Sequence, residues 1–403
     1  MNIAAKQLRS EPFLPHTVLL TGGSGYLGTL LAAKLLASGI TRLIVPLRAE
    51  SAAETFFSRL DNEMAALGVT REKIQGQVET IAWRGHSEIG NDAWGAALDA
   101  YGINEVIHCA GCLDYFNEST LNAVNVQLTE WLLQLGRRWD IKRFTFISTA
   151  YSAGYVDSEI GEELHEEPER DPTIYTLTKR RAEWLVAQSG LPYIILRPSI
   201  LIGEWESGRY SGKRYGLYQQ WMGLERLMTD RYHTDVHTVA PRQPLNLLHQ
   251  DMFQEAFLHA HRWLPDAAVC NFVSDNDSSP SMRQLWDMWI EVVRPHRVHY
   301  YPRFEDVNLR AIDIRQRAYL TFAQVNLQIG AHRWRFRRDW MGVLEANGLV
   351  FHSVTHDSVA RCQARFIETS AAMARYHESF YKEFPEKIIQ EINHYAMEPA
   401  ISI

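Results

Sequence analysis

Short apolar runs alternate with longer amphipathic stretches along the first 200 residues. The short runs are rich in Val, Ile, Leu and Phe, as buried strands are, whereas apolar residues between them recur at helical spacing. The expected strands are 18–21, 43–47, 78–83, 105–109, 143–148 and 193–196. Strands that alternate with helices predict an α/β fold of the Rossmann type, a doubly wound parallel sheet with helices on both faces.

The pattern becomes less regular after Pro198. Residues 245–248, a helix through Trp263 and residues 268–273 are expected to return to the sheet, and helical patterns rich in Trp and Arg follow from Pro280. We therefore expect a smaller, mostly helical C-terminal substrate domain. The expected boundaries are 1–202 for the Rossmann domain, completed by about 235–275, and 203–234 with 276–403 for the substrate-binding or cap region.

The composition is that of a globular protein, and two charged segments stand out within it. The chain has 403 residues, of which 46% are hydrophobic, and a net charge of −7. Residues 157–171 hold eight acidic side chains and predict a mobile, hydrated lid, whereas residues 294–340 are rich in arginine. The arginines would suit CoA phosphates, an acidic carrier protein or a solvated helix face, and the acidic remainder argues against nucleic acid.

Cysteine content and hydropathy bear on the compartment. Four cysteines are too few for a disulfide framework, and no stretch reaches the roughly 18–20 apolar residues of a membrane span. We therefore expect a cytoplasmic protein. The pairs His233/His237 and His352/His356 have helical spacing but lack a metalloprotease pattern, so we expect no metal.

A glycine-rich turn follows the first strand and opens the first helix. Glycines at such a turn let the backbone approach a pyrophosphate, and the helix N-terminus favours the anion. The sequence therefore predicts a dinucleotide-binding site. The residues expected around it are Gly22, Ser24, Gly25, Tyr26, Leu27 and Gly28.

The end of the second strand bears on which dinucleotide binds. An acidic residue there would hold the ribose 2′-hydroxyl of NAD, but the strand ends in Arg48. A guanidinium suits a 2′-phosphate, so NADP is favoured, although a solvated arginine at a strand end is the alternative.

Three side chains form a candidate catalytic set. Tyr175 and Lys179 are one turn apart on a helix expected to begin near Thr173. A nearby ammonium favours the phenolate and would lower the pKa of the tyrosine toward neutrality. Thr149 follows the fifth strand, at the edge where α/β sheets bind ligands. Together the three would donate a proton and stabilise an oxyanion.

With these motifs in place, the chain resembles the extended short-chain dehydrogenases, and within them the thioester reductase and fatty acyl-CoA reductase branch, which is also called male-sterility-like. The resemblance covers about residues 16–275. It rests on the glycine turn, the Tyr175–Lys179 pair and four further segments, which are 106–111, 114–117 with Asn125-Val126, 146–151 and 196–200.

The resemblance implies roles for further residues. Ala110 and Gly111 would pass under the cofactor, Pro198, Ser199 and Ile200 would face the nicotinamide, and Lys179 would hold the ribose. It implies NADPH-dependent reduction of an acyl thioester, carried by CoA or an acyl carrier protein, to an aldehyde or alcohol. Residues 294–340 would be a possible docking segment for the carrier.

Two alternatives remain open from the residues. One is another extended dehydrogenase chemistry, such as nucleotide-sugar epimerisation or dehydration or the oxidation of a hydroxyl group. The other is a non-enzymatic protein that senses the dinucleotide, against which the retention of Thr149, Tyr175 and Lys179 counts.

Overall fold

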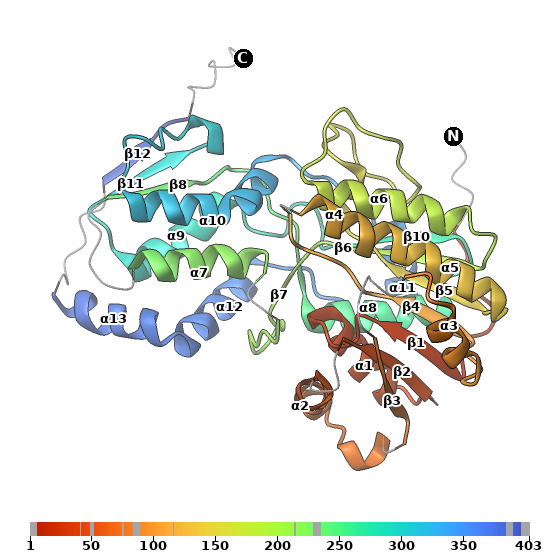
Figure 1. Cartoon of the computed structure of the whole chain (residues 1–403). Helices are drawn as coiled ribbons and strands as arrows, with labels where there is room; N and C mark the ends of the chain where they lie inside the picture. The colour runs from red at the N-terminus through yellow and green to blue at the C-terminus, as the bar shows by residue number, and fades with distance from the viewer. Residues whose placement is uncertain are drawn as a thin grey trace. The chain divides into compact units, whose positions relative to one another are not determined.

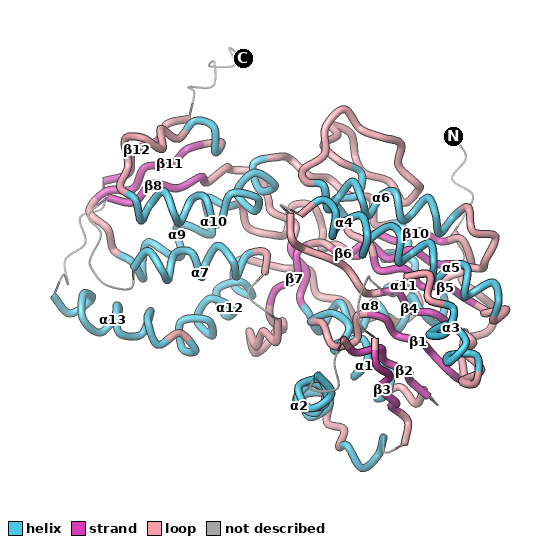
Figure 2. The backbone as a smooth tube through the Cα atoms, viewed as in Figure 1, coloured by secondary structure: helices cyan, strands magenta, loops and turns pink. Residues whose placement is uncertain are grey.

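The computed structural model describes residues 6–40, 42–48, 52–74, 76–83, 89–115, 117–212, 215–228, 235–383 and 390–395. The chain divides into two compact units, each built from three segments (Figures 1 and 2). The first unit comprises Met1–Ser199, Gln250–Val273 and Phe336–His352, and the second comprises Ile200–His249, Ser274–Arg335 and Ser353–Ile403.

The first unit is built on a seven-stranded parallel sheet in the order β10-β6-β5-β4-β1-β2-β3. Its strands are β1 (Thr17–Thr21), β2 (Arg42–Leu47), β3 (Val78–Ala82), β4 (Glu105–His108), β5 (Arg143–Ile147), β6 (Tyr193–Pro198) and β10 (Ala268–Phe272). The central strands are buried, as parallel strands covered on both faces must be. This arrangement confirms the predicted Rossmann-type fold.

Helices cover both faces of this sheet. One face carries α1 (Tyr26–Ala37), α2 (Ala52–Ala66), α8 (Gln250–Trp263) and α11 (Asp339–Ala346), and the other carries α3 (Asp92–Asp99), α4 (Glu118–Asn122), α5 (Leu128–Arg138) and α6 (Ile174–Ala187) (Figure 1). Shorter helical turns are η1 (Arg71–Ile74), the π-helix η3 (Ala123–Gln127) and η4 (Ala150–Ala153). The second face buries a cluster that includes Val106, Leu132, Phe144 and Val186.

The second unit holds two small parallel sheets in addition to helices. One sheet has the order β12-β11-β8, with β8 (Asp235–Val239), β11 (Arg297–Tyr301) and β12 (Gln390–Asn393), and the other pairs β7 (Ile200–Ile202) with β9 (Leu247–His249). The helices are α7 (Leu217–Met228), α9 (Met282–Val293), α10 (Ile314–Ala331), α12 (His356–Thr369) and α13 (Ala371–Glu383), with the turn η5 (Phe304–Asp306). The unit is thus mostly helical, as predicted, but its three-stranded sheet was not anticipated.

The boundaries of the units differ from those expected along the sequence in three places. Residues 200–202 and 235–249 belong to the second unit, because β7 pairs with β9 and β8 with β11, whereas 250–273 complete the first unit. Residues 336–352 return to the first unit, where α11 packs against β10 and α8. Each unit therefore draws on strands and helices from distant parts of the chain.

Candidate active site

The glycine turn between β1 and α1 is closely packed. Gly22 has a positive φ of 73°, and a Cβ there would lie 2.6 Å from the backbone nitrogen of Ala110. A Cβ on Gly28 would overlap the carbonyl oxygen of Gly22. Gly25 is the N-cap of α1 and no side chain caps this helix terminus. Only glycine fits at Gly22 and Gly28, so the turn keeps its backbone close to the loop after β4.

This turn fits the pyrophosphate of a dinucleotide. The first-turn N–H groups of α1 are not capped by a side chain, and such groups bind anions. Ser24, Gly25, Tyr26 and Leu27 are all at least partly exposed. The exposed Gly111 and the partly exposed Ala110 follow β4 beside the turn. These residues would hold the pyrophosphate and the adjoining part of the cofactor.

Arg48 directly follows β2 and is exposed. Among the described residues it has no ion-pair partner, whereas Arg59 of α2 donates from Nη1 to the carbonyl oxygen of Ser24 at 3.1 Å. The guanidinium of Arg48 is therefore available at the carboxyl end of β2, where the resemblance expects the adenosine ribose.

Tyr175 and Lys179 project from the start of α6. Thr173 caps this helix, and its side chain and that of Thr176 bond each other's backbone N–H in a capping box. The N-cap lies where the sequence expects the helix to begin. Thr149, which is 7% exposed, caps η4, and its Oγ1 accepts a hydrogen bond from the Tyr151 N–H at 3.4 Å. Since η4 packs against α6, the three predicted residues belong to neighbouring elements.

Lys179 is 3% exposed and has two close neighbours on β5. Its Nζ donates to the Ile147 carbonyl oxygen at 2.6 Å and lies 4.1 Å from the ring centroid of Phe146. Burial lowers the pKa of Lys179 to about 8, partly offset by Cys109 and Glu183. The ammonium is thus held rigidly against the end of the strand that precedes Thr149.

The hydroxyl of Tyr175 is in a different electrostatic state from the one expected. Burial raises the pKa of Tyr175 above its ordinary value, and Tyr115 and Cys109 raise it further. Tyr115 meets the Tyr175 ring edge-on at a centroid distance of 6.0 Å. The ammonium of Lys179 donates instead to the Ile147 carbonyl at 2.6 Å. Tyr175 is therefore protonated at neutral pH and can act as a proton donor.

The residues expected beside the nicotinamide follow one another in the sequence where the first unit ends and the second begins. Pro198 ends β6, and the backbone N–H of the buried Ser199 donates to the Phe272 carbonyl at 3.0 Å. Ile200 begins β7 and is counted with the second unit. Their role as cofactor contacts remains a prediction.

The acidic run 157–171 is anchored rather than a mobile lid. Asp171 forms an ion pair with Arg180, with two contacts of 2.7 Å, and the carbonyl of His165 accepts from Trp184 Nε1 at 2.9 Å. The side chain of Glu162 is buried and bonded to Lys6 and to the backbone N–H of Trp340. Composition indicates only that the run is polar, whereas these long-range contacts fix it.

Beneath this run lies a fully buried ion pair. Arg197 of β6 donates to Glu183 of α6 at 3.0 and 2.5 Å, and both side chains are 0% exposed. Glu183 also accepts from the Ser148 hydroxyl, and Ser148 directly precedes Thr149. Sequence reasoning missed both charged residues as site residues, although Arg197 lies in a segment that carries the family resemblance.

His165 makes the anchoring of this run sensitive to pH. Arg197 Nη1 donates to His165 Nε2 at 2.8 Å, so the imidazole must keep that nitrogen unprotonated. Burial and the charge of Arg197 lower the pKa of His165 from 6.5 to about 4. A histidine whose pKa is lowered in the folded state stabilises it above the unfolded pKa, and this stability is lost as the pH falls toward 4.

We therefore expect the free energy of unfolding to fall between pH 7 and pH 5, and less so in the His165→Gln variant. The amide oxygen of glutamine can still accept from Arg197 but does not titrate in this range. Urea unfolding at both pH values should show a loss smaller by about 1–2 kcal/mol in the variant. Equal losses in the two proteins would show that His165 does not titrate on unfolding.

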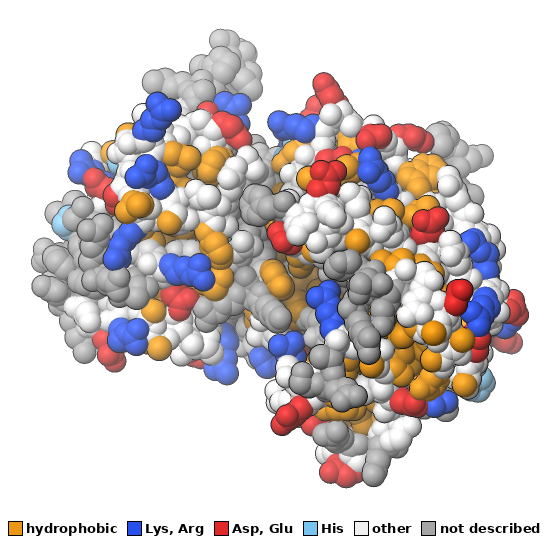
Figure 3. All heavy atoms as spheres, viewed as in Figure 1, with side chains coloured by type: hydrophobic (Ala, Val, Ile, Leu, Met, Phe, Trp, Pro, Cys, Tyr) orange, Lys and Arg blue, Asp and Glu red, His pale blue; other side chains and the backbone are white. Residues whose placement is uncertain are grey.

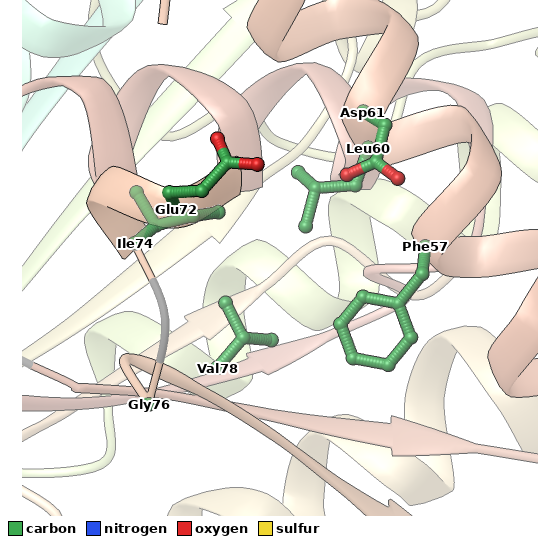
Figure 4. Close-up of a pocket in the computed structure, with 7 residues that line it drawn as sticks. All are labelled: Phe57, Leu60, Asp61, Glu72, Ile74, Gly76 and Val78. Carbon is green, nitrogen blue, oxygen red and sulfur yellow. The ribbon is translucent and has the colours of Figure 1, made fainter. Parts of the chain in front are cut away.

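The first unit also contains a pocket away from the predicted site. It encloses about 380 Å³ between α2, η1 and the start of β3, and Figure 4 shows two carboxylates beside an otherwise apolar lining. Its lining residues are Phe57, Leu60, Asp61, Glu72, Ile74, Gly76 and Val78. Val78 is the first residue of β3, so the pocket borders the amino end of that strand, whereas the predicted site residues follow the carboxyl ends.

Most arginines of the segment 294–340 for which contacts are described have acidic partners. Examples are Arg297 with Asp235, Arg303 with Asp306, Arg335 with Asp277, Arg337 with Asp339 and Arg338 with Glu345. On the face drawn in Figure 3, basic and acidic side chains are interspersed. The segment is thus less strongly basic as a surface than its composition indicates.

The described residues hold neither a candidate membrane span nor a candidate metal site. None of the helices in the described ranges is long and apolar enough to cross a membrane. No group of three or more His, Cys, Asp or Glu side chains within those ranges could hold a metal ion. His237 lies on β8 rather than on a helix, and His233 is outside the described residues.

Curated proteins with related sequences are named as reductases and peptide synthetases. The chain is 27% identical over 221 residues to L-2-aminoadipate reductase of Schizosaccharomyces pombe, covering 48% of this chain and 15% of that protein. It is 28% identical over 246 residues to fatty acyl-CoA reductase 1 of Gallus gallus, covering 49% of this chain and 45% of that protein. The chain thus spans less than half the length of either relative.

Solved structures share the fold across most of the chain. The terminal R domain of the myxalamid PKS-NRPS pathway superposes with a TM-score of 0.69 at 19% identity, covering 88% of this chain and 91% of that one. A thiolation-reductase di-domain from an archaeal non-ribosomal peptide synthetase gives 0.62 at 17% identity, covering 89% and 91%. A family model described as male sterility protein matches residues 20–256, which is more than half of the sequence. The chain therefore belongs to the male sterility protein family, whose NAD(P)-binding Rossmann domain carries the candidate active site.

Proposed function

We propose that this protein is an NADPH-dependent reductase that converts an acyl thioester to an aldehyde or alcohol. The observation that carries the proposal is the placement of Tyr175 and Lys179 on α6, with Thr149 capping the neighbouring η4, in a domain that also holds the glycine turn. The thioester as substrate is inferred from relatives named L-2-aminoadipate reductase and fatty acyl-CoA reductase.

The chain's own residues would bind the thioester carbonyl and supply a proton. The cofactor, when bound, supplies a hydride. The hydroxyls of Thr149 and Tyr175 would hydrogen-bond the carbonyl oxygen and stabilise its developing negative charge. Tyr175 would donate its proton to that oxygen, which the protonated state of its buried hydroxyl permits. The hemithioacetal would then release the thiol and leave an aldehyde.

Lys179 would act on Tyr175 and on the cofactor ribose. Its Nζ has a donor position bound to the Ile147 carbonyl, and an ammonium has three donors in total. The remaining donors would hold the ribose and stabilise charge at Tyr175 when its proton leaves. The pKa of Lys179, about 8, is also close to neutral pH.

Arg48 is the residue that we propose selects NADP. Replacing it with Asp removes a cation from the expected 2′-phosphate and adds a carboxylate that can accept from a 2′-hydroxyl. We expect Arg48→Asp to weaken NADPH binding by about tenfold or more, since a charge-assisted hydrogen bond contributes about 1.5–3 kcal/mol. NADH binding should be kept or improved.

Fluorescence titration of both nucleotides measures this change, with Arg59→Asp as the matched control on α2. Arg59 is bonded to a backbone carbonyl and should affect both nucleotides alike. Equal weakening of NADPH and NADH by Arg48→Asp would contradict its role in selection.

The names of the relatives and solved neighbours suggest two carriers for the acyl group. A carrier protein is suggested by the solved neighbours titled as an R domain of a PKS-NRPS pathway and a thiolation-reductase di-domain. CoA is suggested by the relatives named fatty acyl-CoA reductases. The arginines of 294–340 would contact the acidic carrier, and charge reversal at Arg335 and Arg337 tests this by a rise in KM for a carrier-bound substrate.

Nucleotide-sugar chemistry is the second candidate. Solved neighbours in complex with NAD and with UDP or UDP-glucose share the fold, each with a TM-score of 0.56 at 16–17% identity. These neighbours show the fold alone. Purified protein should be incubated with NADPH and a panel of acyl-CoA esters and acyl-carrier thioesters while NADPH absorbance is followed, and with UDP-sugars while the sugar products are separated by chromatography, since epimerisation and dehydration consume no cofactor. Oxidation of NADPH with a thioester supports the proposal, and turnover of a UDP-sugar alone overturns it.

A further inference from the structure

A buried chain of hydrogen bonds crosses the first unit from the end of β1 to α5. His108, the last residue of β4, is 0% exposed and contacts a hydroxyl on each side. Its Nδ1 lies 2.7 Å from Thr21 Oγ1, and its Nε2 lies 2.9 Å from Thr129 Oγ1. Thr21 directly precedes Gly22 of the glycine turn, which is called the cofactor turn here because it is expected to bind the dinucleotide. Thr129 lies near the start of α5. The imidazole thus links the cofactor turn to a helix on the face of the sheet that α6 covers.

The series of hydrogen bonds continues from Thr129 to α6, the helix that carries Tyr175 and Lys179. Thr129 Oγ1 donates to the Asn125 carbonyl at 2.8 Å, and the Asn125 amide donates from Nδ2 to Thr178 Oγ1 at 3.0 Å. Thr178 then donates to the Tyr175 carbonyl at 2.9 Å and is the neighbour of Lys179. Asn125 sits in the π-helix η3. The series of hydrogen bonds therefore ends at Thr178, between the two candidate catalytic residues of α6.

Asn125 also fixes the loop that follows β4. Its Oδ1 accepts from the Cys112 N–H at 2.9 Å, and Cys112 comes directly after Gly111. A Cβ on Gly111 would lie 3.6 Å from that Oδ1. The same side chain therefore holds both the loop expected under the cofactor and the helix expected to carry the proton donor.

The donors and acceptors of this chain determine the tautomer of His108. Thr129 has one hydroxyl proton, and it goes to the Asn125 carbonyl, which can only accept. His108 Nε2 must therefore carry a proton and donate to Thr129 Oγ1. Nδ1 is then the acceptor and receives the proton of Thr21 Oγ1. Only the neutral Nε2–H form satisfies every group in the chain.

The surroundings of the ring keep His108 neutral. Burial lowers the pKa of His108 well below its ordinary value, and the positive charge of Lys179 lowers it further. The Phe146 ring neighbours both groups, with its centroid 4.1 Å from Lys179 Nζ and 5.6 Å from the centroid of the imidazole. A charged imidazole would repel the ammonium and leave Thr21 without an acceptor.

We propose that His108, locked as the neutral Nε2–H tautomer, is a positioning residue for the reaction. Through Thr21 and Thr129 it sets the distance between the cofactor turn and the helix that carries Tyr175 and Lys179. It touches neither substrate nor cofactor. The proposal rests on the proposed function for its kinetic consequence, whereas the tautomer follows from the hydrogen bonds alone.

A matched pair of variants at Thr129 tests the proposal. Thr129→Val keeps the shape of the side chain but removes both hydrogen bonds, whereas Thr129→Ser keeps the hydroxyl. A small displacement of reacting groups costs up to about a hundredfold in rate, so we expect Thr129→Val to lower kcat by about tenfold to a hundredfold. The KM for the thioester should change far less, and Thr129→Ser should restore most of kcat.

Imidazole ¹⁵N shifts give a readout that does not depend on activity. In the unchanged protein, the shifts of His108 should show a protonated Nε2 and an unprotonated Nδ1 throughout the range from about pH 5 to 8. The signal that moves on Thr129→Val identifies His108. Equal kcat in the Val and Ser variants would overturn the positioning role, and an Nδ1–H tautomer or a titration in this range would overturn the lock.

The two proposals fail differently in this experiment. If the unchanged protein reduces no thioester, the proposed function fails, yet the ¹⁵N shifts still decide whether the imidazole is locked. If thioesters are reduced and the shifts show a different tautomer, the proposed function stands and the role of His108 is refuted.

Discussion

Tyr175→Phe is expected to lower kcat for thioester reduction by about 10²–10⁴-fold, because a positioned proton donor contributes that much to catalysis. The change removes one hydroxyl and keeps the ring that meets Tyr115 edge-on. The dissociation constant for NADPH should stay close to that of the unchanged protein, since the glycine turn is untouched. Initial rates with a thioester that the unchanged protein reduces give kcat, and a fluorescence titration with NADPH gives the dissociation constant.

The matched control is Tyr193→Phe, which makes the same chemical change at the amino end of β6. Tyr193 lies at the opposite end of its strand from Pro198, where the predicted site begins. This variant should keep its full rate. A Tyr175→Phe protein with unchanged kcat, or a Tyr193→Phe protein with an equal loss, would remove Tyr175 from its assigned role.

Glu183→Gln is expected to destabilise the fold by about 3–5 kcal/mol, because it leaves the guanidinium of Arg197 buried without its counter-ion. Both side chains are fully buried, so solvent cannot replace the lost charge. The carboxylate of Glu183 accepts from Arg197 and from the Ser148 hydroxyl with two charged oxygens, whereas a glutamine side chain has a single, uncharged acceptor oxygen. The midpoint of urea unfolding at pH 7 reports the change.

The surface pair of Asp140 and Lys142 supplies the control for this change. Its side chains are 91% and 62% exposed, and exposed pairs contribute about 0–1 kcal/mol. Asp140 has a positive φ of 49°, which asparagine tolerates, so Asp140→Asn does not strain the backbone. If Glu183→Gln and Asp140→Asn shift the midpoint equally, the buried pair has no special weight in this fold.

The Rossmann-type sheet could be predicted because its strands differ clearly from its helices. The residues of β1 and β5 form apolar runs too short for helices, and both strands are fully buried. Glycines at close approaches, such as Gly22 and Gly28, leave a signal that is local in sequence. The capping threonine of α6 is equally local, so the helix that carries the candidate catalytic residues was predicted to begin near Thr173.

The parts that sequence reasoning missed depend on contacts between distant residues. The three-stranded sheet of the second unit pairs His299 with His237, and the strands are too short and too polar on one face to be recognised singly. The acidic run was predicted to be mobile because charge alone does not reveal that Glu162 meets Lys6, 156 residues away. Arg197 and Glu183 likewise form a pair only in the folded chain.

The electrostatics of the site illustrate the same limit. One turn of helix separates Tyr175 from Lys179, which correctly indicates a shared face. Helical spacing cannot show that the ammonium bonds the Ile147 carbonyl, nor that burial dominates both pKa values. Residue type and spacing therefore identify the candidate groups, and packing sets their protonation.

The most direct test of the proposed chemistry is to follow the hydride itself. NADPH carrying deuterium at the transferred position should be incubated with the protein and an acyl thioester, and the product trapped and examined by mass spectrometry. The account predicts deuterium on the former carbonyl carbon of an aldehyde or alcohol, with release of the free thiol. Release of thiol to give a carboxylic acid without deuterium, while NADPH is unchanged, would contradict it.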